Sequence, residues 1–237
     1  MSSDLDRKTT VGIIQTGRVG GSLGVKYGEY PDMFMTLFKG EPFDYTVYPA
    51  IDRKFPKHPL ECDAWVITGS KHAVYEDLDW IRPLETFIRK LVVSGQPTVG
   101  ICFGHQLMAQ AMGGKVAKFP GGWNIGRMTL TDLVNTQDAR LHFSHEDQVM
   151  EPPENAELIM TADFCLFAGF KYSPSCFSMQ AHPELTLPFM VDLINQRRGL
   201  QLTTEHADDA LASLAGPNDQ EIYGGWIADI LKGERRI

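Results

Sequence analysis

Short hydrophobic runs alternate with amphipathic stretches along the first half of the chain. Four runs rich in apolar or β-branched residues predict buried strands; they span residues 10–15 (TVGIIQ), 43–49 (FDYTVYP), 62–70 (CDAWVITGS) and 97–101 (PTVGI). Apolar residues at helical spacing predict helices over residues 30–40, 79–95 and about 103–114. Strands and helices in this alternation are typical of an α/β fold, with a mostly parallel sheet covered on both faces.

Glycine and proline mark the limits of these elements. A flexible loop is expected after the first strand, because four glycines lie close together there: Gly17, Gly20, Gly21 and Gly24. Pro31 fits the first turn of the next helix, and Gly40 ends that helix. Gly95 predicts the C-terminal cap of the helix over residues 79–95.

The pattern changes after residue 114. Short strand-like runs follow at residues 115–119, 126–132, 156–162, 165–170 and 176–180. From Leu187 onward the spacing is helical, with a polar break at residues 216–218. No repeat or linker interrupts the chain, so we expect one domain over residues 1–237, with a core at about 9–198 and a helical C-terminal extension at about 199–237.

Composition places the chain among soluble globular proteins. It has 237 residues, 43% of them hydrophobic, and a formal net charge of -8, which argues against a broad nucleic-acid surface. No apolar stretch approaches the roughly 18 residues needed to cross a membrane, and Met1 to Lys8 lack the apolar centre of a signal peptide. A reduced, cytoplasmic protein with no metal or cofactor is expected, because no paired or zinc-like spacing links the four cysteines, Cys62, Cys102, Cys165 and Cys176.

One of these cysteines stands at an unusual junction. In residues 99–116 (VGICFGHQLMAQAMGGKV) a predicted strand meets a predicted helix at Cys102, with Gly100 and Gly104 on either side. This spacing allows the sharp turn that exposes a nucleophile, and the start of a helix favours a thiolate. A buried core cysteine and a metal ligand are the alternatives, since cysteine is among the most buried residue types.

A nucleophilic cysteine needs a base, and His182 is the candidate. In Ala181-His182-Pro183-Glu184 the proline restricts His182 to an extended conformation. Residues two apart in an extended chain point the same way, so Glu184 would accept a hydrogen bond from one imidazole nitrogen while the other faces the sulfur. Taken alone, such a triplet is also typical of a solvated loop.

Together these segments resemble the class I glutamine amidotransferase family. The resemblance rests on Gly100-x-Cys102-x-Gly104-x-Gln106, Gly113-Gly114, His182-Pro183-Glu184 and residues 144–149 (SHEDQV). Residues 27–34 (YGEYPDMF) are similar to stand-alone members of the family. The resemblance implies a flavodoxin-like three-layer sandwich with a mostly parallel central sheet, and a catalytic triad of Cys102, His182 and Glu184.

The resemblance also implies a reaction. The γ-amide of glutamine or of a related γ-glutamyl compound would be cleaved through a cysteinyl thioester, releasing ammonia or an amine. The oxyanion would be stabilised by the backbone N–H of Phe103 and by that of Gly69 or Ser70. The substrate would be bound by three polar residues, Gln106, Ser144 and His145.

Three positions depart from the family pattern. Ala181 precedes His182, where an aromatic residue is common, and Asn124 and Arg127 lie in a segment that matches the family only loosely. These departures predict an altered pocket, consistent with an acyl donor bulkier than glutamine.

Alternatives to independent hydrolysis are open at this point. A separate synthase subunit would receive the ammonia, because the chain has no G-x-x-x-x-G-K loop and too few residues beyond the core for a synthase domain. A non-catalytic binding or regulatory protein, or a redox-active cysteine protein, would use a similar fold. The oligomeric state is open, and Trp226 is either a packing anchor or a subunit contact.

Overall fold

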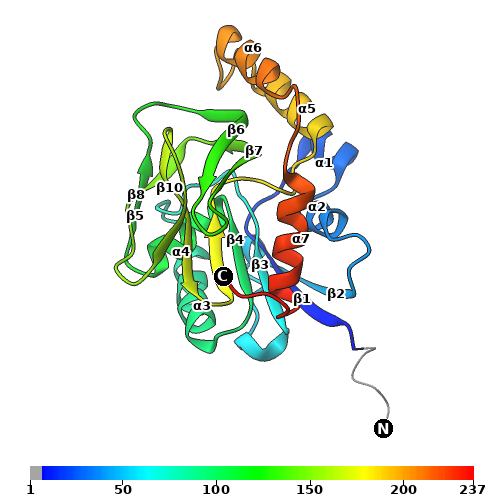
Figure 1. The fold of residues 1–237 in the computed structure, drawn as a ribbon, viewed down its shortest axis with the longest axis vertical. Coiled ribbons are helices and arrows are strands. Elements are labelled where there is room, and N and C mark those ends of the chain that lie inside the picture. The colour runs from blue at the N-terminus through cyan, green and yellow to red at the C-terminus, as the bar shows by residue number, and fades with distance from the viewer. Residues whose placement is uncertain (1–6) are drawn as a thin grey trace.

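A nine-stranded sheet forms the centre of the computed structural model, which describes residues 7–237 (Figure 1). Its strands lie in the order β2 (Phe43–Pro49), β1 (Thr9–Gln15), β3 (Ala64–Ile67), β4 (Thr98–Ile101), β11 (Cys176–Met179), β10 (Cys165–Ser173), β9 (Glu157–Ala162), β6 (Asn124–Asp132) and β7 (Gln137–His145). The strands from β2 to β11 are parallel, and those from β11 to β7 pair antiparallel. A separate antiparallel pair joins β5 (Lys115–Lys118) to β8 (Asp147–Glu151).

Helices cover both faces of the parallel part. On one face α3 (Ile81–Ser94) and α4 (Phe103–Ala111) bury their apolar stripes with Trp65 and Ile67 of β3. On the other face α2 (Tyr30–Leu37) and α7 (Gln220–Leu231) pack on β1 and β4. A third apolar cluster joins α1 (Gly21–Tyr27), α5 (Leu187–Arg197) and α6 (Thr204–Ser213), at the upper end in Figure 1. The predicted three-layer α/β fold is confirmed.

Two segments of the structure differ from the sequence-based expectation. The flexible loop expected around Gly21 and Gly24 is instead helix α1, because its Leu23 is buried in the third cluster and its Lys26 pairs with Asp192 of α5 at 2.6 Å. The strands β7 and β8 were not predicted. In β7 the polar residues His142 and His145 are buried together with apolar neighbours. The strand therefore lacks the alternation of apolar and polar residues by which a strand is recognised in a sequence.

The C-terminal helix α7 is part of the packing on the central sheet. The Trp226 ring lies 4.7 Å from that of Phe177 on β11, centroid to centroid, and only 5% of Trp226 is exposed. Trp226 is therefore a packing anchor within the chain. Within the described range 7–237, no helix combines the length and apolar character required for a membrane span.

Candidate active site

Cys102 occupies a strained turn between β4 and α4. Its φ of 54° and ψ of -104° lie outside the ordinary helical and extended regions. The turn is held on both sides, since the Cys102 N–H donates to the Met179 carbonyl at 2.9 Å and its carbonyl accepts from the Gln106 N–H at 3.0 Å. The thiol thus lies at the carboxyl end of a parallel strand and the start of a helix.

The two glycines beside Cys102 permit close packing of this turn. A Cβ on Gly104 would lie 2.4 Å from the Ile67 carbonyl oxygen, and one on Gly100 would lie 2.5 Å from Met108 Sδ. Neither glycine has a positive φ. Their small size lets α4 approach β3 and β4 closely enough to place Cys102 beside the neighbouring strand ends.

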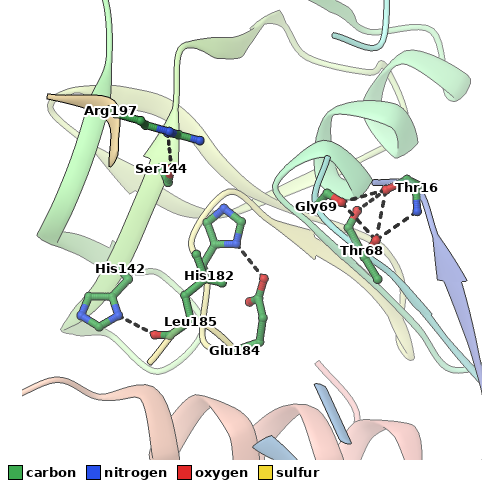
Figure 2. A network of polar contacts seen from close by, with 9 residues as sticks. All are labelled: Thr16, Thr68, Gly69, His142, Ser144, His182, Glu184, Leu185 and Arg197. Atoms are coloured by element: carbon green, nitrogen blue, oxygen red, sulfur yellow. Dashed lines mark hydrogen bonds and ion pairs between the residues drawn. The ribbon is translucent and has the colours of Figure 1, made fainter. Parts of the chain in front are cut away.

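His182 and Glu184 lie on the loop after β11. Nδ1–H of His182 donates to Oε1 of Glu184 at 2.7 Å (Figure 2), and both side chains are almost fully buried. The His182 backbone N–H also donates to the His142 carbonyl at 2.8 Å, which ties the loop to β7. Burial alone would lower the pKa of His182, but the Glu184 carboxylate and the Cys102 sulfur together raise it well above its usual range.

The third corner of this arrangement is Gly69, at the end of β3. A Cβ built there would lie 3.2 Å from His182 Cε1 and 3.7 Å from Cys102 Cβ, so the ring and the thiol face the same small space. The Nε2 atom of His182 is buried and forms no hydrogen bond within residues 7–237. It is therefore free to exchange a proton with the sulfur or with a bound substrate.

The residues predicted to form the oxyanion hole lie at two adjacent strand ends. Phe103 is the first residue of α4, where backbone N–H groups have no partner within the helix. The loop with Gly69 and Ser70 is anchored to β1. Thr16 Oγ1 and Thr68 Oγ1 each lie 3.1 Å from the Gly69 carbonyl oxygen (Figure 2). Ser70 Oγ donates to the Thr16 carbonyl at 2.9 Å.

The two threonines were not predicted as part of the site. Each of them directly follows a parallel strand, Thr16 after β1 and Thr68 after β3. This position is the only signal in the sequence, since the carboxyl ends of parallel strands lie at one edge of the sheet, where ligands bind. Their hydroxyls lie within hydrogen-bond distance of the Gly69 carbonyl oxygen and so hold the peptide that also carries the Ser70 N–H.

A cavity of about 140 Å³ opens beside Cys102. All three predicted substrate-binding residues line it: Gln106, Ser144 and His145. Their polar atoms are largely committed to the protein. Gln106 Nε2 donates to the Asp147 carbonyl at 2.8 Å and to Gln180 Oε1 at 3.0 Å, and Ser144 Oγ accepts from Arg197 at 2.8 Å.

His145 leaves one acceptor free in this region. Its Nδ1–H donates to the Asp147 carbonyl at 3.1 Å, which leaves Nε2 as a lone-pair acceptor, buried and without a partner in the described chain. Burial lowers the pKa of His145 to about 3, so the ring is neutral at physiological pH. It is suited to accept an N–H of a ligand rather than to bind an anion.

Sequence reasoning missed the cation in the cavity wall. The Arg197 guanidinium lies 4.5 Å from the centroid of the Trp123 ring and reaches Ser144 from the last turn of α5 (Figure 2). Arg197 lies beyond all the recognised motifs, and only the fold brings it to residue 144. Residues 7–237 contain no group of three or more His, Cys, Asp or Glu that would hold a metal ion.

The three departures from the family pattern lie outside the cavity wall. Ala181 is buried in the apolar cluster of α2 and α7, and Asn124 is buried at the start of β6. Arg127 donates to the carbonyls of Ser213 and Pro217 at 2.8 Å and 3.3 Å. None of the three lines the cavity beside Cys102. That they alter the pocket stays a prediction.

Comparisons with known proteins show which family the chain resembles. The sequence model of Glutamine amidotransferase class-I matches residues 42–190. Gamma-glutamyl peptidase 2 from Arabidopsis thaliana is 30% identical over 225 residues, covering 88% of this chain and 90% of that protein. A glutamine-hydrolyzing GMP synthase subunit from Saccharolobus solfataricus is 28% identical over 169 residues, covering 67% of this chain and 85% of that protein.

A solved structure supports the fold. The crystal structure of a glutamine amidotransferase from Thermotoga maritima superposes with a TM-score of 0.72 at 20% identity, covering 96% of this chain and 98% of that one. The chain belongs to the class I glutamine amidotransferase family. Within it, the similarity to a protein named as a gamma-glutamyl peptidase extends over most of both chains.

Proposed function

We propose that the protein is a hydrolase that cleaves the γ-amide bond of a γ-glutamyl compound through a thioester on Cys102. The observation that carries this proposal is the left-handed turn at Cys102, which holds the thiol opposite a buried His182–Glu184 pair. A cysteine of a redox protein needs no such distant base. A non-catalytic binding protein would not keep two buried ionisable side chains, which are costly to bury.

The chemistry runs in two halves. The Cys102 thiolate attacks the γ-carbonyl carbon, and His182, as the imidazolium, gives its Nε2 proton to the departing nitrogen as the C–N bond breaks. Water then attacks the thioester with His182 as general base, and free glutamate leaves. Glu184 keeps the second proton on Nδ1 and stabilises the imidazolium by its charge.

The negative charge that develops on the carbonyl oxygen needs fixed donors. We assign this role to the backbone N–H of Phe103 and to the N–H of Gly69 or Ser70, at the adjacent strand end. Each donor of this kind lowers the barrier by about 3–4 kcal/mol in comparable enzymes. Thr16 and Thr68 act as positioning residues, since they hold the Gly69 peptide without touching the reacting atoms.

The acyl donor carries a leaving group larger than ammonia. A second cavity, of about 310 Å³, adjoins the first, and the two share Lys71, Arg197 and Gln201 as walls. Its remaining lining includes apolar side chains of α1 and α5 and the cation Arg18. Apolar walls with a few cations suit the amine part of a γ-glutamyl peptide, which has a carboxylate. The family relative named as a gamma-glutamyl peptidase agrees with this choice.

The experiment is a panel of donors tested on the purified chain. Glutamine, γ-glutamyl dipeptides and γ-glutamyl amines are compared by release of glutamate and of ammonia or amine. The proposal expects hydrolysis with water as the only acceptor, a higher kcat/KM for dipeptides than for glutamine, and no activity in Cys102→Ala. If glutamine is the only donor hydrolysed, the proposal of a peptide donor is ruled out. If no donor is hydrolysed, independent hydrolysis is ruled out.

A second candidate is a glutaminase subunit that passes ammonia to a separate synthase. The similarity to the glutamine-hydrolyzing GMP synthase from Saccharolobus solfataricus favours it. It predicts that the isolated chain hydrolyses no donor and that it gains glutaminase activity when a cell extract supplies the partner. The panel of donors therefore separates the two candidates.

A further inference from the structure

The linker between α6 and α7 contacts β7, the strand that holds the loop with His182 and Glu184. This linker lies beyond the residues that match the family model, which end at 190. It docks on the free edge of β7, where Asp219 and Arg140 exchange two hydrogen bonds of 2.8 Å and 2.9 Å. Two residues further along β7, the same edge meets the catalytic loop, because the His182 N–H donates to the His142 carbonyl.

The side chain of Asn218 faces His142 with a defined polarity. Its Oδ1 accepts the Gln220 backbone N–H at 2.9 Å, so the atom that lies 2.9 Å from His142 Nε2 is the amide nitrogen. An amide nitrogen only donates, and therefore Nε2 of His142 is the acceptor and carries no proton.

The tautomer of His142 follows from this contact. With Nε2 unprotonated, the single proton of the neutral ring is on Nδ1, and it donates to the Leu185 carbonyl at 2.6 Å (Figure 2). Leu185 directly follows Glu184. The catalytic loop is thus held at His182 by the His142 carbonyl and at Leu185 by the His142 ring.

We propose that Asn218 is a positioning residue of the active site. It fixes the protonation of His142, and His142 in turn clamps the loop that orients the catalytic pair. The proposal rests on the proposed hydrolase function, because orientation of His182 is its consequence. Misplacement of a catalytic group by about 1 Å can lower the rate roughly 100-fold, so loss of the contact between Asn218 and His142 should lower kcat measurably.

Two substitutions at this position are expected to differ in how kcat depends on pH. In Asn218→Ala the Nε2 atom loses its donor, either tautomer forms, and kcat falls by roughly tenfold with KM nearly unchanged. In Asn218→Asp the carboxylate accepts only, so Nε2 must carry a proton. At low pH the ring is then an imidazolium that keeps its bond to Leu185, and kcat is rescued.

As the pH rises, the Asn218→Asp variant loses a proton from His142. The carboxylate retains the one on Nε2, so the proton facing Leu185 is lost and kcat falls along a new alkaline limb. The other charged groups that act on His142 are His182 and Glu184 on the catalytic loop and Arg127 on β6. These groups are the same in all variants, so the new alkaline limb of kcat is caused by the substitution at position 218. Ala215→Asp is the matched control, since it adds the same charge to an exposed site of the linker.

The experiment measures kcat, KM and the rate of Cys102 alkylation from pH 5 to 9, together with the imidazole ¹⁵N shifts of His142. The proposal expects Nε2 of His142 unprotonated in the wild type and the control, and protonated in Asn218→Asp with the new limb. A wild-type proton on Nε2, or wild-type profiles in both Asn218 variants, would overturn it. If the wild type hydrolyses no donor, the proposed function fails, and the alkylation rates still decide the role of Asn218.

Discussion

The Nδ1 atom of His182 lies 2.7 Å from Oε1 of Glu184, two residues further along the same loop. Both side chains are buried, so their charges are poorly screened by water. The raised pKa of His182 follows from this contact and from the neighbouring sulfur. It keeps the imidazolium, the acid for the leaving amine, protonated at neutral pH.

Replacing Glu184 by Gln tests this electrostatic role. The variant keeps the shape of the side chain but removes the charge, so kcat should fall by about two to four orders of magnitude. The pKa of His182 should fall too, which moves the alkaline limb of kcat to lower pH because the imidazolium is lost earlier. Glu205→Gln on exposed α6 is the control. An unchanged rate in Glu184→Gln would reduce the site to a Cys102–His182 pair.

Arg197 is expected to act on substrate affinity. Removal of its charge by Arg197→Gln takes away the guanidinium that lines both cavities, so KM for a γ-glutamyl dipeptide should rise about tenfold with a smaller change in kcat. The adjacent Arg198→Gln is a matched control, since Arg198 pairs with Asp208 on the outside of α6. Equal KM values in the two variants would contradict a role in binding.

The buried His105 should make stability depend on pH. Its Nε2–H donates to the Phe167 carbonyl at 3.0 Å and its Nδ1 accepts from Ser178, and burial lowers its pKa to about 4 from an ordinary 6.5. Between these values the unfolded chain binds the proton more tightly. The free energy of unfolding therefore falls as the pH drops from about 6.5 to about 4, by on the order of 3 kcal/mol.

This loss is measured by urea unfolding at several pH values. The comparison of wild type with His105→Asn isolates the contribution of this histidine, because the variant lacks the titrating ring. Its stability is lower throughout, but it should fall less steeply with acid. His206→Asn, on the outer helix α6, serves as the control. Parallel pH profiles for wild type and His105→Asn would refute the assignment.

Trp226 tests the proposal that the C-terminal extension belongs to one domain with the core. Its ring packs against Phe177 of the central sheet, so Trp226→Ala should lower the free energy of unfolding by about 3–5 kcal/mol. Ile222→Ala on the exposed side of α7 should cost far less. A single cooperative transition that shifts as a whole is expected. Two transitions, of which only one responds to Trp226→Ala, would mean that the extension folds separately.

The sequence predicts the parts of this protein that depend on local rules. The turn at Cys102, the cap at Gly95 and the strands of the parallel sheet are encoded in a few neighbouring residues, and the structure has them there. The His182–Glu184 contact is local too, since an extended chain points residues two apart in one direction.

Other parts arise only when distant segments meet. Helix α1 forms despite its glycines because α5 covers Leu23, and β7 is a strand although polar rings face inward. Arg197 and Asn218 touch the site from segments with no motif, and they are recognised only by their contacts with Ser144 and His142. A single sequence has no periodic signal for such contacts between residues tens of positions apart.

Cys102 is the nucleophile of the proposed reaction, and one labelling measurement tests this role directly. The protein is treated with a glutamine-analogue electrophile, with and without a γ-glutamyl dipeptide, and the labelled peptide is identified by mass spectrometry. Cys62, Cys165 and Cys176 are internal controls, because none of them lines the cavity beside Cys102, and burial raises the pKa of the Cys165 and Cys176 thiols to about 12. A single label on Cys102, slowed by the dipeptide and abolished in Cys102→Ala, is the predicted result. Equal labelling of the other cysteines, or labelling of Cys102 that the dipeptide leaves unchanged, would contradict it.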